Sequence, residues 1–319
     1  IEPTGTVRIN DLVRGVIEFQ CAELDDQILL KSDGFPTYHL AVVVDDHAAG
    51  ITHVMRGEEW IPSTPKHILL YQAFGWEPPI FAHLSLFMNK GGGKLSKREG
   101  ATALLEYRKL GYLPEAVVNF IAFLGWNPKT TEEFFSLDEL AKVFDLTQVN
   151  TANPIFDTEK LDWYNGYYLR KLSPDELLNY CRSYLPNQTD DFLLKIVTLE
   201  QERLKKLSDI TELTDFFFQD QLTYPADLLV WKKSTAELTK QYLLELVTEL
   251  KQYNDWTTQL LEQKIVAWIK LKRWGNGDVL WPMRVALSGK KASPPPFAIA
   301  AILGKERTLA RIQLAINLL

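Results

Sequence analysis

The segment NKGGGKLSKREG, residues 89–100, holds the residues best suited to chemistry in this chain. Three consecutive glycines lead into Lys94, Ser96 and Lys97, which place two ammonium groups and a hydroxyl close together. Glycine loses more backbone freedom on folding than any other residue, so a run of three is costly to order and indicates a backbone that must approach a ligand. Such a loop suits an anion, above all a polyphosphate whose charge changes during a reaction. A solvated surface loop is the alternative that these residues alone leave open.

The spacing of this segment excludes a P-loop. That motif reads G-x-x-x-x-G-K-[ST], whereas here the glycines directly precede Lys94. Two ammonium–phosphate hydrogen bonds of roughly 1.5–3 kcal/mol each, strengthened only in the transition state, would accelerate a step about 100-fold or more. The segment therefore predicts charge stabilisation on a polyphosphate by a different kind of loop.

Alternating strand and helix patterns precede the segment and must position it. The sequence predicts strands at 6–10, 15–20 and 26–31, a helix or buried strand around 38–47, a strand at 51–57, a helix at 64–74 and a strand at 80–88. Pro65 in the first turn and Gly75 as the stop support the second helix. The order strand, helix, strand, loop is that of a parallel α/β sheet, in which ligands bind beyond the carboxyl ends of the strands.

Helical patterns dominate after the segment. Two helices are predicted on either side of residues 111–114, and Ser136 with Glu139 forms a capping-box signature. From about residue 174 onward nearly every segment has apolar residues at helical spacing. We therefore expect an α/β half-domain joined to a helical arm.

The composition is that of an ordinary soluble globular protein. Of the 319 residues, 46% are hydrophobic and 24% are charged, and no apolar run reaches 18 residues, so no membrane span is expected. The two cysteines, Cys21 and Cys181, are far apart and fit neither a zinc site nor a disulfide framework. A reducing cytoplasm is the compartment that this pattern favours.

The last third of the chain carries a local excess of positive charge. The whole chain has a net charge of −6, yet residues 264–311 contain ten basic and two acidic residues, a balance of +8. Trp268, Trp274 and Trp281 lie in the same stretch, although we expect Trp281 to be a core residue. Cations with aromatic rings suit RNA phosphates and unstacked bases. The alternative is a solvated helical face.

KLSKR, residues 94–98, resembles the K-M-S-K-S signature of class I aminoacyl-tRNA synthetases, in the K-L-S-K-R spelling typical of glutamyl-tRNA synthetases. The resemblance covers essentially the whole chain and is densest from Asp33 to Trp126. YLPEAVVNFIAFLGW and LWPMRVALSGKKASPPPF resemble the family's stem-contact and anticodon-binding regions. The resemblance implies an α/β plus all-α fold, with a partial Rossmann-like nucleotide-binding fold, a stem-contact region and a helical anticodon-binding domain.

The resemblance also implies how the chain is divided. It predicts a remnant of the acceptor-binding insertion at 1–31, the C-terminal half of the catalytic domain at 32–89, the signature loop and stem-contact domain at 90–173, and two helical anticodon-binding subdomains at 174–232 and 233–319.

On the nucleotide side, the resemblance implies ATP with Mg²⁺ as the cofactors and no metal held by the protein itself. Lys97 and Lys94 would stabilise the departing pyrophosphate as glutamate is activated. Ser96 would orient the loop or contact a phosphate, and Glu59 would contact the adenosine.

On the amino-acid side, the resemblance implies that Arg56, in VMRGEEW, pairs with the γ-carboxylate of glutamate, because arginine presents a planar bidentate fork. Without the family context Arg56 would be a surface arginine at a strand end. Tyr38 and Trp60 would line the same pocket. One departure is Val42, which stands where many members have an asparagine.

For RNA, the resemblance implies tRNA(Glu) as the partner of a monomeric cytoplasmic enzyme. Lys272 and Arg273, in KLKRWGNGDVLWPMR, are the predicted contacts of the helical arm. Arg98 would contact the tRNA or an acidic neighbour.

The histidines and one acidic pair are expected to have ordinary roles. The five histidines have no ligand spacing, so we expect core or helix positions: His39, His47, His53, His67 and His83. Asp45 and Asp46, directly before His47, either cap a helix or contact the 3′ end of the tRNA.

Two other functions stay open. A glutaminyl-tRNA synthetase relative would share the fold and loop, but that family usually has M-S-K in the loop and a β-barrel anticodon region. A non-catalytic tRNA-binding protein is disfavoured by the intact pair Lys94 and Lys97.

The second signature of class I synthetases, H-I-G-H or a close variant, does not occur in these 319 residues. The N-terminal half of the nucleotide-binding sheet and most of the acceptor-binding insertion are also expected to be missing. Since the H-I-G-H motif supplies donors to the ATP phosphates, this polypeptide alone should not form glutamyl-adenylate.

We predict that residues 1–319 catalyse no measurable pyrophosphate exchange with glutamate and ATP. The assay is exchange of labelled pyrophosphate into ATP, with a complete glutamate–tRNA ligase as the positive control. Robust exchange by the 319-residue chain would contradict the expectation.

Overall fold

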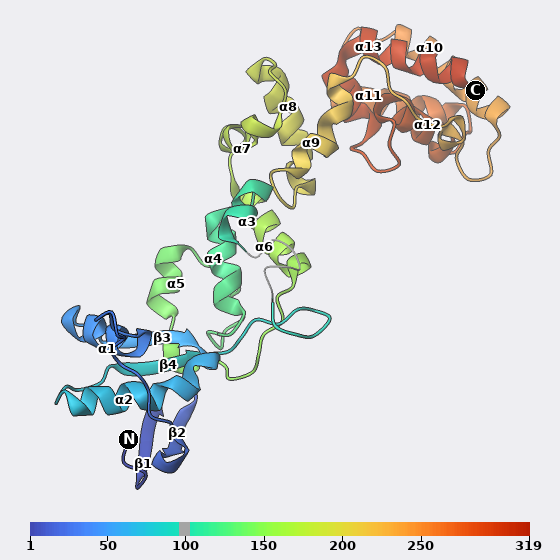
Figure 1. Ribbon diagram of the computed structural model, residues 1–319. Coiled ribbons are helices and arrows are strands. Elements are labelled where there is room, and N and C mark those ends of the chain that lie inside the picture. The colour runs from blue at the N-terminus through green and yellow to red at the C-terminus, as the bar shows by residue number, and fades with distance from the viewer. Residues whose placement is uncertain (96–102) are drawn as a thin grey trace. The chain divides into compact units, whose positions relative to one another are not determined.

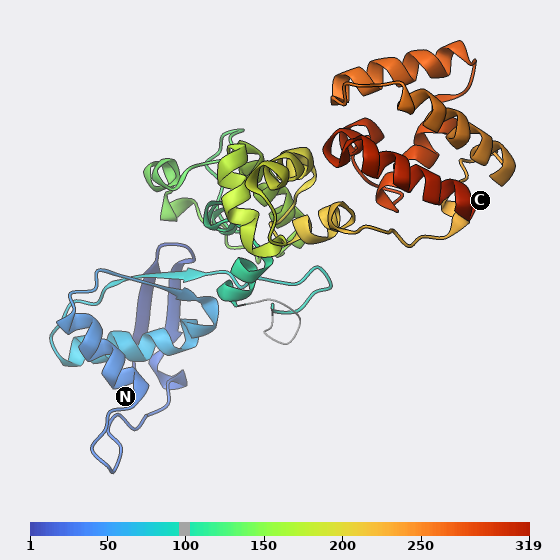
Figure 2. The ribbon, with the colours of Figure 1, turned by 90° about the horizontal axis from the view of Figure 1, so that it is seen from above.

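The computed structural model describes residues 1–95 and 103–319, which form two compact units (Figures 1 and 2). The first unit comprises Ile1–Tyr107 and Pro114–Tyr164, and the second comprises Arg108–Leu113 and Asn165–Leu319. All the described strands belong to the first unit, whereas helices build the second. The predicted α/β plus all-α fold is confirmed.

A four-stranded mixed sheet forms the centre of the first unit. Its strands are β1 (Thr6–Asp11), β2 (Gly15–Gln20), β3 (His53–Gly57) and β4 (Ile80–Leu84), in the order β2-β1-β4-β3. β3 and β4 are parallel, as predicted, and β1 and β2 add an antiparallel pair joined to β4. One sheet therefore contains strands from both sides of the predicted domain boundary at 31/32. The division of the chain into these domains stays a prediction.

The strand predicted at 26–31 does not form. Leu30 makes only an isolated bridge to Pro36. Leu29 packs against the apolar contact between α1 and α2, but Ile28 is 74% exposed and Leu30 is 58% exposed, so one side chain alone anchors the stretch. Alternation without a buried face does not hold a strand in a sheet.

Two helices cover the sheet near the site. The ambiguous run at 38–47 is helix α1 (Tyr38–Ala48), and α2 (Thr64–Ala73) follows the short 3₁₀ helix η2 (Glu58–Ser63). Gly75 takes a left-handed φ of 70° just after α2, as the predicted stop requires. α2 packs on β1 and β4 through Ile68, whose neighbours in that core are Val7, Ile9, Cys21 and Phe81. The crossover from β3 through η2 and α2 to β4 thus brings three element ends together.

The remaining helices follow the sequence pattern. They are α3 (Leu104–Leu110), α4 (Pro114–Phe123), α5 (Leu137–Val143), α6 (Thr158–Lys171), α7 (Pro174–Cys181), α8 (Asp190–Glu200), α9 (Asp209–Thr214), α10 (Ala236–Lys251), α11 (Thr258–Leu271), α12 (Asn276–Ser288) and α13 (Pro296–Leu318). The capping box before α5 is confirmed, because Ser136 accepts from the backbone N–H of Glu139 and donates its own backbone N–H to the Glu139 carboxylate. Within residues 1–95 and 103–319, no helix has the length and apolarity needed to cross a membrane.

An apolar core unites the C-terminal helices of the second unit. Leu243 and Leu246 of α10, Met283 of α12 and Ile312 of α13 are fully buried in it. Arg311 is also buried there and donates to the backbone carbonyls of Leu287, Phe216 and Gln219. Burial lowers the pKa of Arg311 to about 10.

Candidate functional site

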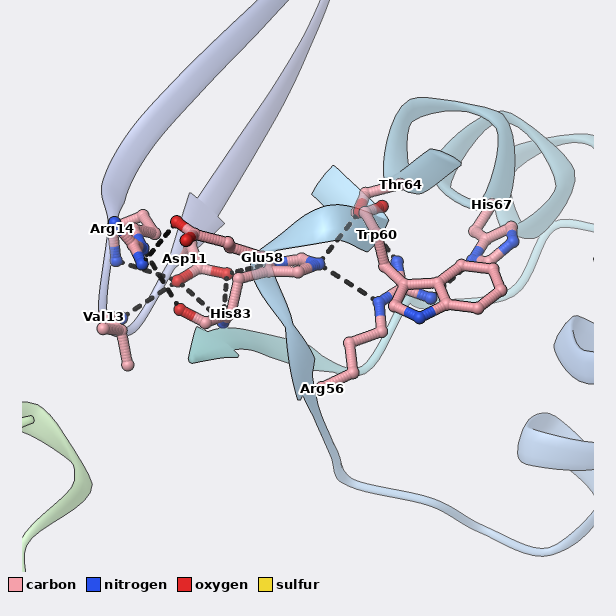
Figure 3. A network of polar contacts seen from close by, with 9 residues as sticks. All are labelled: Asp11, Val13, Arg14, Arg56, Glu58, Trp60, Thr64, His67 and His83. Carbon is pink, nitrogen blue, oxygen red and sulfur yellow. Dashed lines mark hydrogen bonds and ion pairs between the residues drawn. The ribbon is translucent and has the colours of Figure 1, made fainter. Parts of the chain in front are cut away.

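Arg56, near the end of β3, lies at the centre of a polar network (Figure 3). Its Nε donates to Nε2 of His83 at 3.1 Å, and its Nη2 donates to Oγ1 of Thr64 at 2.7 Å. Its Nη1 lies 3.4 Å from Nδ1 of His67. These three acceptors come from β4 and α2, so the β3–α2–β4 crossover determines where the guanidinium lies.

The Arg56 guanidinium has no carboxylate partner among the described residues. In the part of the chain that the structure describes, no carboxylate oxygen lies within the 4.0 Å of an ion pair with Arg56. Burial lowers the pKa of Arg56, while the Tyr38 hydroxyl and the more distant carboxylates of Asp46 and Asp11 act in the opposite sense. A half-buried cation surrounded by neutral acceptors is well suited to an anion that arrives from outside.

Two predicted aromatic residues border this cation. The Trp60 ring centroid lies 5.7 Å from Cζ of Arg56 and 5.1 Å from the Tyr38 ring. Tyr38 remains 50% exposed, so its ring forms an open wall. Val42, the departure from the family pattern, packs against the apolar contact between α1 and α2. The three residues predicted to bind glutamate, Tyr38, Arg56 and Trp60, therefore lie together. Their roles stay proposals.

The histidines are less scattered than the sequence predicts. His39 and His67 meet through Nδ1 and Nε2 at 2.9 Å, and His67 and His83 both contact Arg56. Burial, with the nearby Arg56 charge, lowers the pKa of His67 to about 4. Burial also lowers the pKa of His83, although Asp11 opposes the shift. These three histidines do occupy helix or core positions, as expected, and they also lie close together because α1, α2 and β4 converge at one place.

The other histidine singled out by the sequence has a packing role. The His47 ring stacks on Trp76, with centroids 3.8 Å apart and planes at 5°. Asp45 and Asp46 lie near the C-terminal end of α1. Since a carboxylate caps a helix by accepting from free N–H groups at the N-terminus, the capping alternative is wrong. The tRNA contact of this pair stays a prediction.

Asp11 and Arg14 are site residues that the sequence did not predict. Oδ2 of Asp11 lies 2.6 Å from Nδ1 of His83, and Oδ1 accepts from the backbone N–H groups of Val13 and Arg14. Burial by itself would raise the pKa of Asp11, but the hydrogen bonds from Arg14, His83 and Val13 lower it overall. Arg14 forms an ion pair with Glu58 at 2.7 Å. Only the pairing of β1 with β4 brings Asp11 to this place, and no sequence motif announces it.

The glycine run before Lys94 is a turn. Gly92 and Gly93 have φ values of 84° and 87°, in the left-handed region that favours glycine. Asn89 donates its backbone N–H to the Gly93 carbonyl, and Met88 and Lys94 form an antiparallel bridge. The turn thereby reverses the chain and presents the first lysine of the predicted signature.

Lys94 reaches a second predicted nucleotide residue. Its Nζ lies 3.2 Å from Oε1 of Glu59, which is next to Trp60 in η2. The lysine and Arg56 therefore border the same short helix, η2, and their roles stay proposals. The other predicted residues of this segment, Ser96, Lys97 and Arg98, lie outside the described residues.

Only half of the basic stretch in the second unit is available at the surface. Lys272 is ion-paired with Glu245 at 2.7 Å, whereas Arg273 is exposed and has a left-handed φ of 60°. Five of the ten basic residues are partly or fully buried: Arg284, Lys290, Lys305, Arg307 and Arg311. The other five are exposed: Lys264, Lys270, Lys272, Arg273 and Lys291. The +8 balance therefore overstates the charge that faces solvent.

The tryptophans of the basic stretch are core residues or pack on the core. Trp268 is 8% exposed, and its ring meets the Trp274 ring edge-on at 5.3 Å. Trp281, expected in the core, donates from Nε1 to the Leu228 carbonyl at 2.8 Å. These rings stabilise the helical arm.

The sequence matches two families in succession. Residues 1–163 match the family described as tRNA synthetases class I (E and Q), catalytic domain, and residues 176–316 match the anticodon binding domain. The chain belongs to the class I tRNA synthetases for E and Q. A glutamate–tRNA ligase of Clostridium tetani is 45% identical in an alignment 319 positions long that covers 98% of this chain and 65% of the relative. One of Dehalococcoides mccartyi strain BAV1 is 41% identical over 324 residues, 98% of this chain and 66% of the relative.

The solved structures agree with this assignment. A crystal structure of a glutamate tRNA ligase from Elizabethkingia meningosepticum, in complex with its amino acid, superposes with a TM-score of 0.86 at 36% identity. The match covers 98% of this chain and 66% of that protein. This synthetase chain thus spans about two thirds of the length of its relatives, and the family predicted from KLSKR is confirmed.

The backbone of Arg273 leads to a stability prediction. Arg273 follows the C-cap of α11, and its left-handed conformation costs a non-glycine residue about 1–2 kcal/mol, whereas glycine is the usual residue there. Arg273→Gly should therefore raise the free energy of unfolding by about 1 kcal/mol, the remainder being offset by the freedom of glycine in the unfolded chain. Urea titration of the chain measures the change.

Lys270→Gly is the matched control. It removes the same charge from an exposed position inside α11, where glycine should destabilise by about 1 kcal/mol. A loss of stability in Arg273→Gly equal to that in the control would contradict the conformational account.

Proposed function

We propose that this chain works in a glutamate–tRNA ligase, which uses ATP to form glutamyl-adenylate and transfers glutamate to tRNA(Glu). The observation that carries the proposal is the uncompensated guanidinium of Arg56 between Trp60 and Tyr38, beside the Lys94–Glu59 pair. The relatives at 41–45% identity bear the name glutamate–tRNA ligase, which supports the same reaction.

Arg56 favours glutamate over glutamine as the substrate. A carboxylate offers two charged acceptors to a guanidinium, whereas an amide offers one neutral acceptor and brings N–H groups against N–H groups. A glutaminyl enzyme would also be expected to have a β-barrel anticodon region, while the elements of residues 174–319 are helices. Both observations support the glutamate-specific enzyme.

We propose that Lys94, Glu59 and the other residues of the KLSKR signature bind ATP. Lys94 and Lys97 would neutralise charge on the leaving pyrophosphate, with Ser96 on a phosphate and Glu59 toward the adenosine. Among the described residues no cluster of histidine, cysteine or acidic side chains could hold a metal ion, so these residues offer Mg²⁺ no protein cage. Mg²⁺ typically binds through substrate phosphates, and it would supply charge neutralisation there.

The helical second unit is proposed to bind the tRNA. Arg273 is exposed and, among the described residues, has no ion pair, so we place it on a phosphate. Lys272 would first have to leave Glu245. We propose that the enzyme acts as a cytoplasmic monomer.

Substitution of Arg56 tests the proposal. The chain should bind glutamate at least about tenfold more tightly than glutamine, a difference of about 1.4 kcal/mol, and Arg56→Gln should abolish the preference because it removes the cation. Calorimetric titration with both amino acids measures this preference. Arg8→Gln removes an exposed arginine from β1 and should leave the preference unchanged. Equal preference in Arg56→Gln and the unaltered chain would contradict the assignment of Arg56.

A further inference from the structure

We propose that Asp11, His83 and Thr64 are positioning residues for the Arg56 guanidinium. His83 and Thr64 accept hydrogen bonds along one edge of the guanidinium, Asp11 orients His83, and a terminal nitrogen is left for the substrate carboxylate. The inference rests on the proposed function, and it adds residues outside the loop and pocket predicted from the sequence. The three side chains come from β1, from β4 and from the start of α2, and Figure 3 shows them around Arg56.

The contact with Asp11 determines which nitrogen of His83 carries the proton. Asp11 accepts hydrogen bonds from the backbone N–H groups of Val13, Arg14 and His83, as a carboxylate does. A carboxylate can only accept, so at 2.6 Å the proton between it and the ring belongs on Nδ1 of His83. Nε2 of a neutral ring is then an acceptor.

Nε2 of His83, as an acceptor, faces the Nε–H group of Arg56. Nε of Arg56 can only donate, and it lies 3.1 Å from Nε2 of His83. A proton on Nε2 would place two N–H groups against each other beside a buried cation. Asp11 therefore acts on Arg56 through the tautomer of His83, in the way that outer carboxylates orient histidines at other sites.

Thr64 accepts the second hydrogen bond along this edge of the guanidinium. Its hydroxyl donates to the Trp60 carbonyl at 3.1 Å, which leaves an oxygen lone pair for Nη2 of Arg56 at 2.7 Å. Oγ1 of Thr64 and Nε2 of His83 are 3.2 Å apart, so Nε and Nη2 of Arg56 donate to two adjacent neutral atoms. This edge would otherwise bind a carboxylate with both nitrogens.

The remaining donors follow by counting. A guanidinium has five N–H groups. One on Nε is taken by His83, one on Nη2 by Thr64, and one on Nη1 faces His67 at 3.4 Å. The Tyr38 hydroxyl also forms a hydrogen bond with the guanidinium. Among the described residues this leaves one N–H on a terminal nitrogen for another acceptor, and none of these partners is a carboxylate.

Two substitutions of His83 separate its two contacts. His83→Gln can present its amide oxygen near the former Nε2 position, so it keeps an acceptor for Arg56. His83→Asn places its amide near the former Nδ1 position, so it keeps the contact with Asp11 and loses the acceptor. We expect glutamate affinity to fall at least about tenfold in His83→Asn and to stay within about threefold in His83→Gln. Equal loss in both variants would overturn the proposal.

Nitrogen NMR of the labelled chain gives a second readout that does not depend on substrate. We expect His83 to be protonated on Nδ1 alone, and we expect a slowly exchanging Arg56 Nε–H signal in the unaltered chain and in His83→Gln but not in His83→Asn. Protonation on Nε2 would overturn the proposal. If the unaltered chain shows no preference for glutamate over glutamine, the proposed function fails, while these signals still decide the positioning role.

A variant pair at Thr64 covers the case in which either His83 variant fails to fold. Thr64→Ser keeps the hydroxyl, and Thr64→Val keeps the shape without an acceptor. Loss of glutamate affinity in Thr64→Val, with affinity retained in Thr64→Ser, supports the proposal that the Thr64 hydroxyl positions Arg56. Identical affinities in the two would overturn it.

Discussion

The whole arrangement depends on a half-buried cation, Arg56, that has no counter-ion among residues 1–95 and 103–319. Removing a charge from water is costly unless hydrogen bonds and opposite charge compensate. In this synthetase chain, Arg56 donates hydrogen bonds to neutral acceptors, and we propose that a ligand supplies the opposite charge. Arg14, by contrast, is already ion-paired with Glu58, so the two neighbouring arginines have different tasks. We therefore propose a structural role for Arg14 and a role in ligand recognition for Arg56.

Local sequence patterns predicted the parts of the site that lie within one segment. The glycine run predicted a loop before Lys94, and Gly92 and Gly93 take left-handed conformations there that only glycine adopts at little cost. Trp60 is the fourth residue after Arg56, so their proximity needs only a strand end and a turn of η2. The family resemblance added Tyr38, which no local pattern links to them.

The parts that local patterns could not predict depend on pairing between distant elements. Asp11 reaches His83 only because β1 pairs with β4, and three histidines meet only because α1 and α2 converge on that strand. The charge count of residues 264–311 overstated the positive charge at the surface for a related reason. A basic residue such as Arg311 can be internal and bound to carbonyl groups, which a sum of charges cannot reveal.

The most direct test of the central claim is to give Arg56 an internal carboxylate. Thr64→Asp places a negative charge beside Nη2, while Thr64→Asn provides nearly the same shape without the charge. If the guanidinium is reserved for a substrate, Thr64→Asp should unfold at a higher temperature than Thr64→Asn and should lose glutamate binding at least about tenfold relative to it. Glutamate binding by Thr64→Asp as tight as by Thr64→Asn would contradict the account.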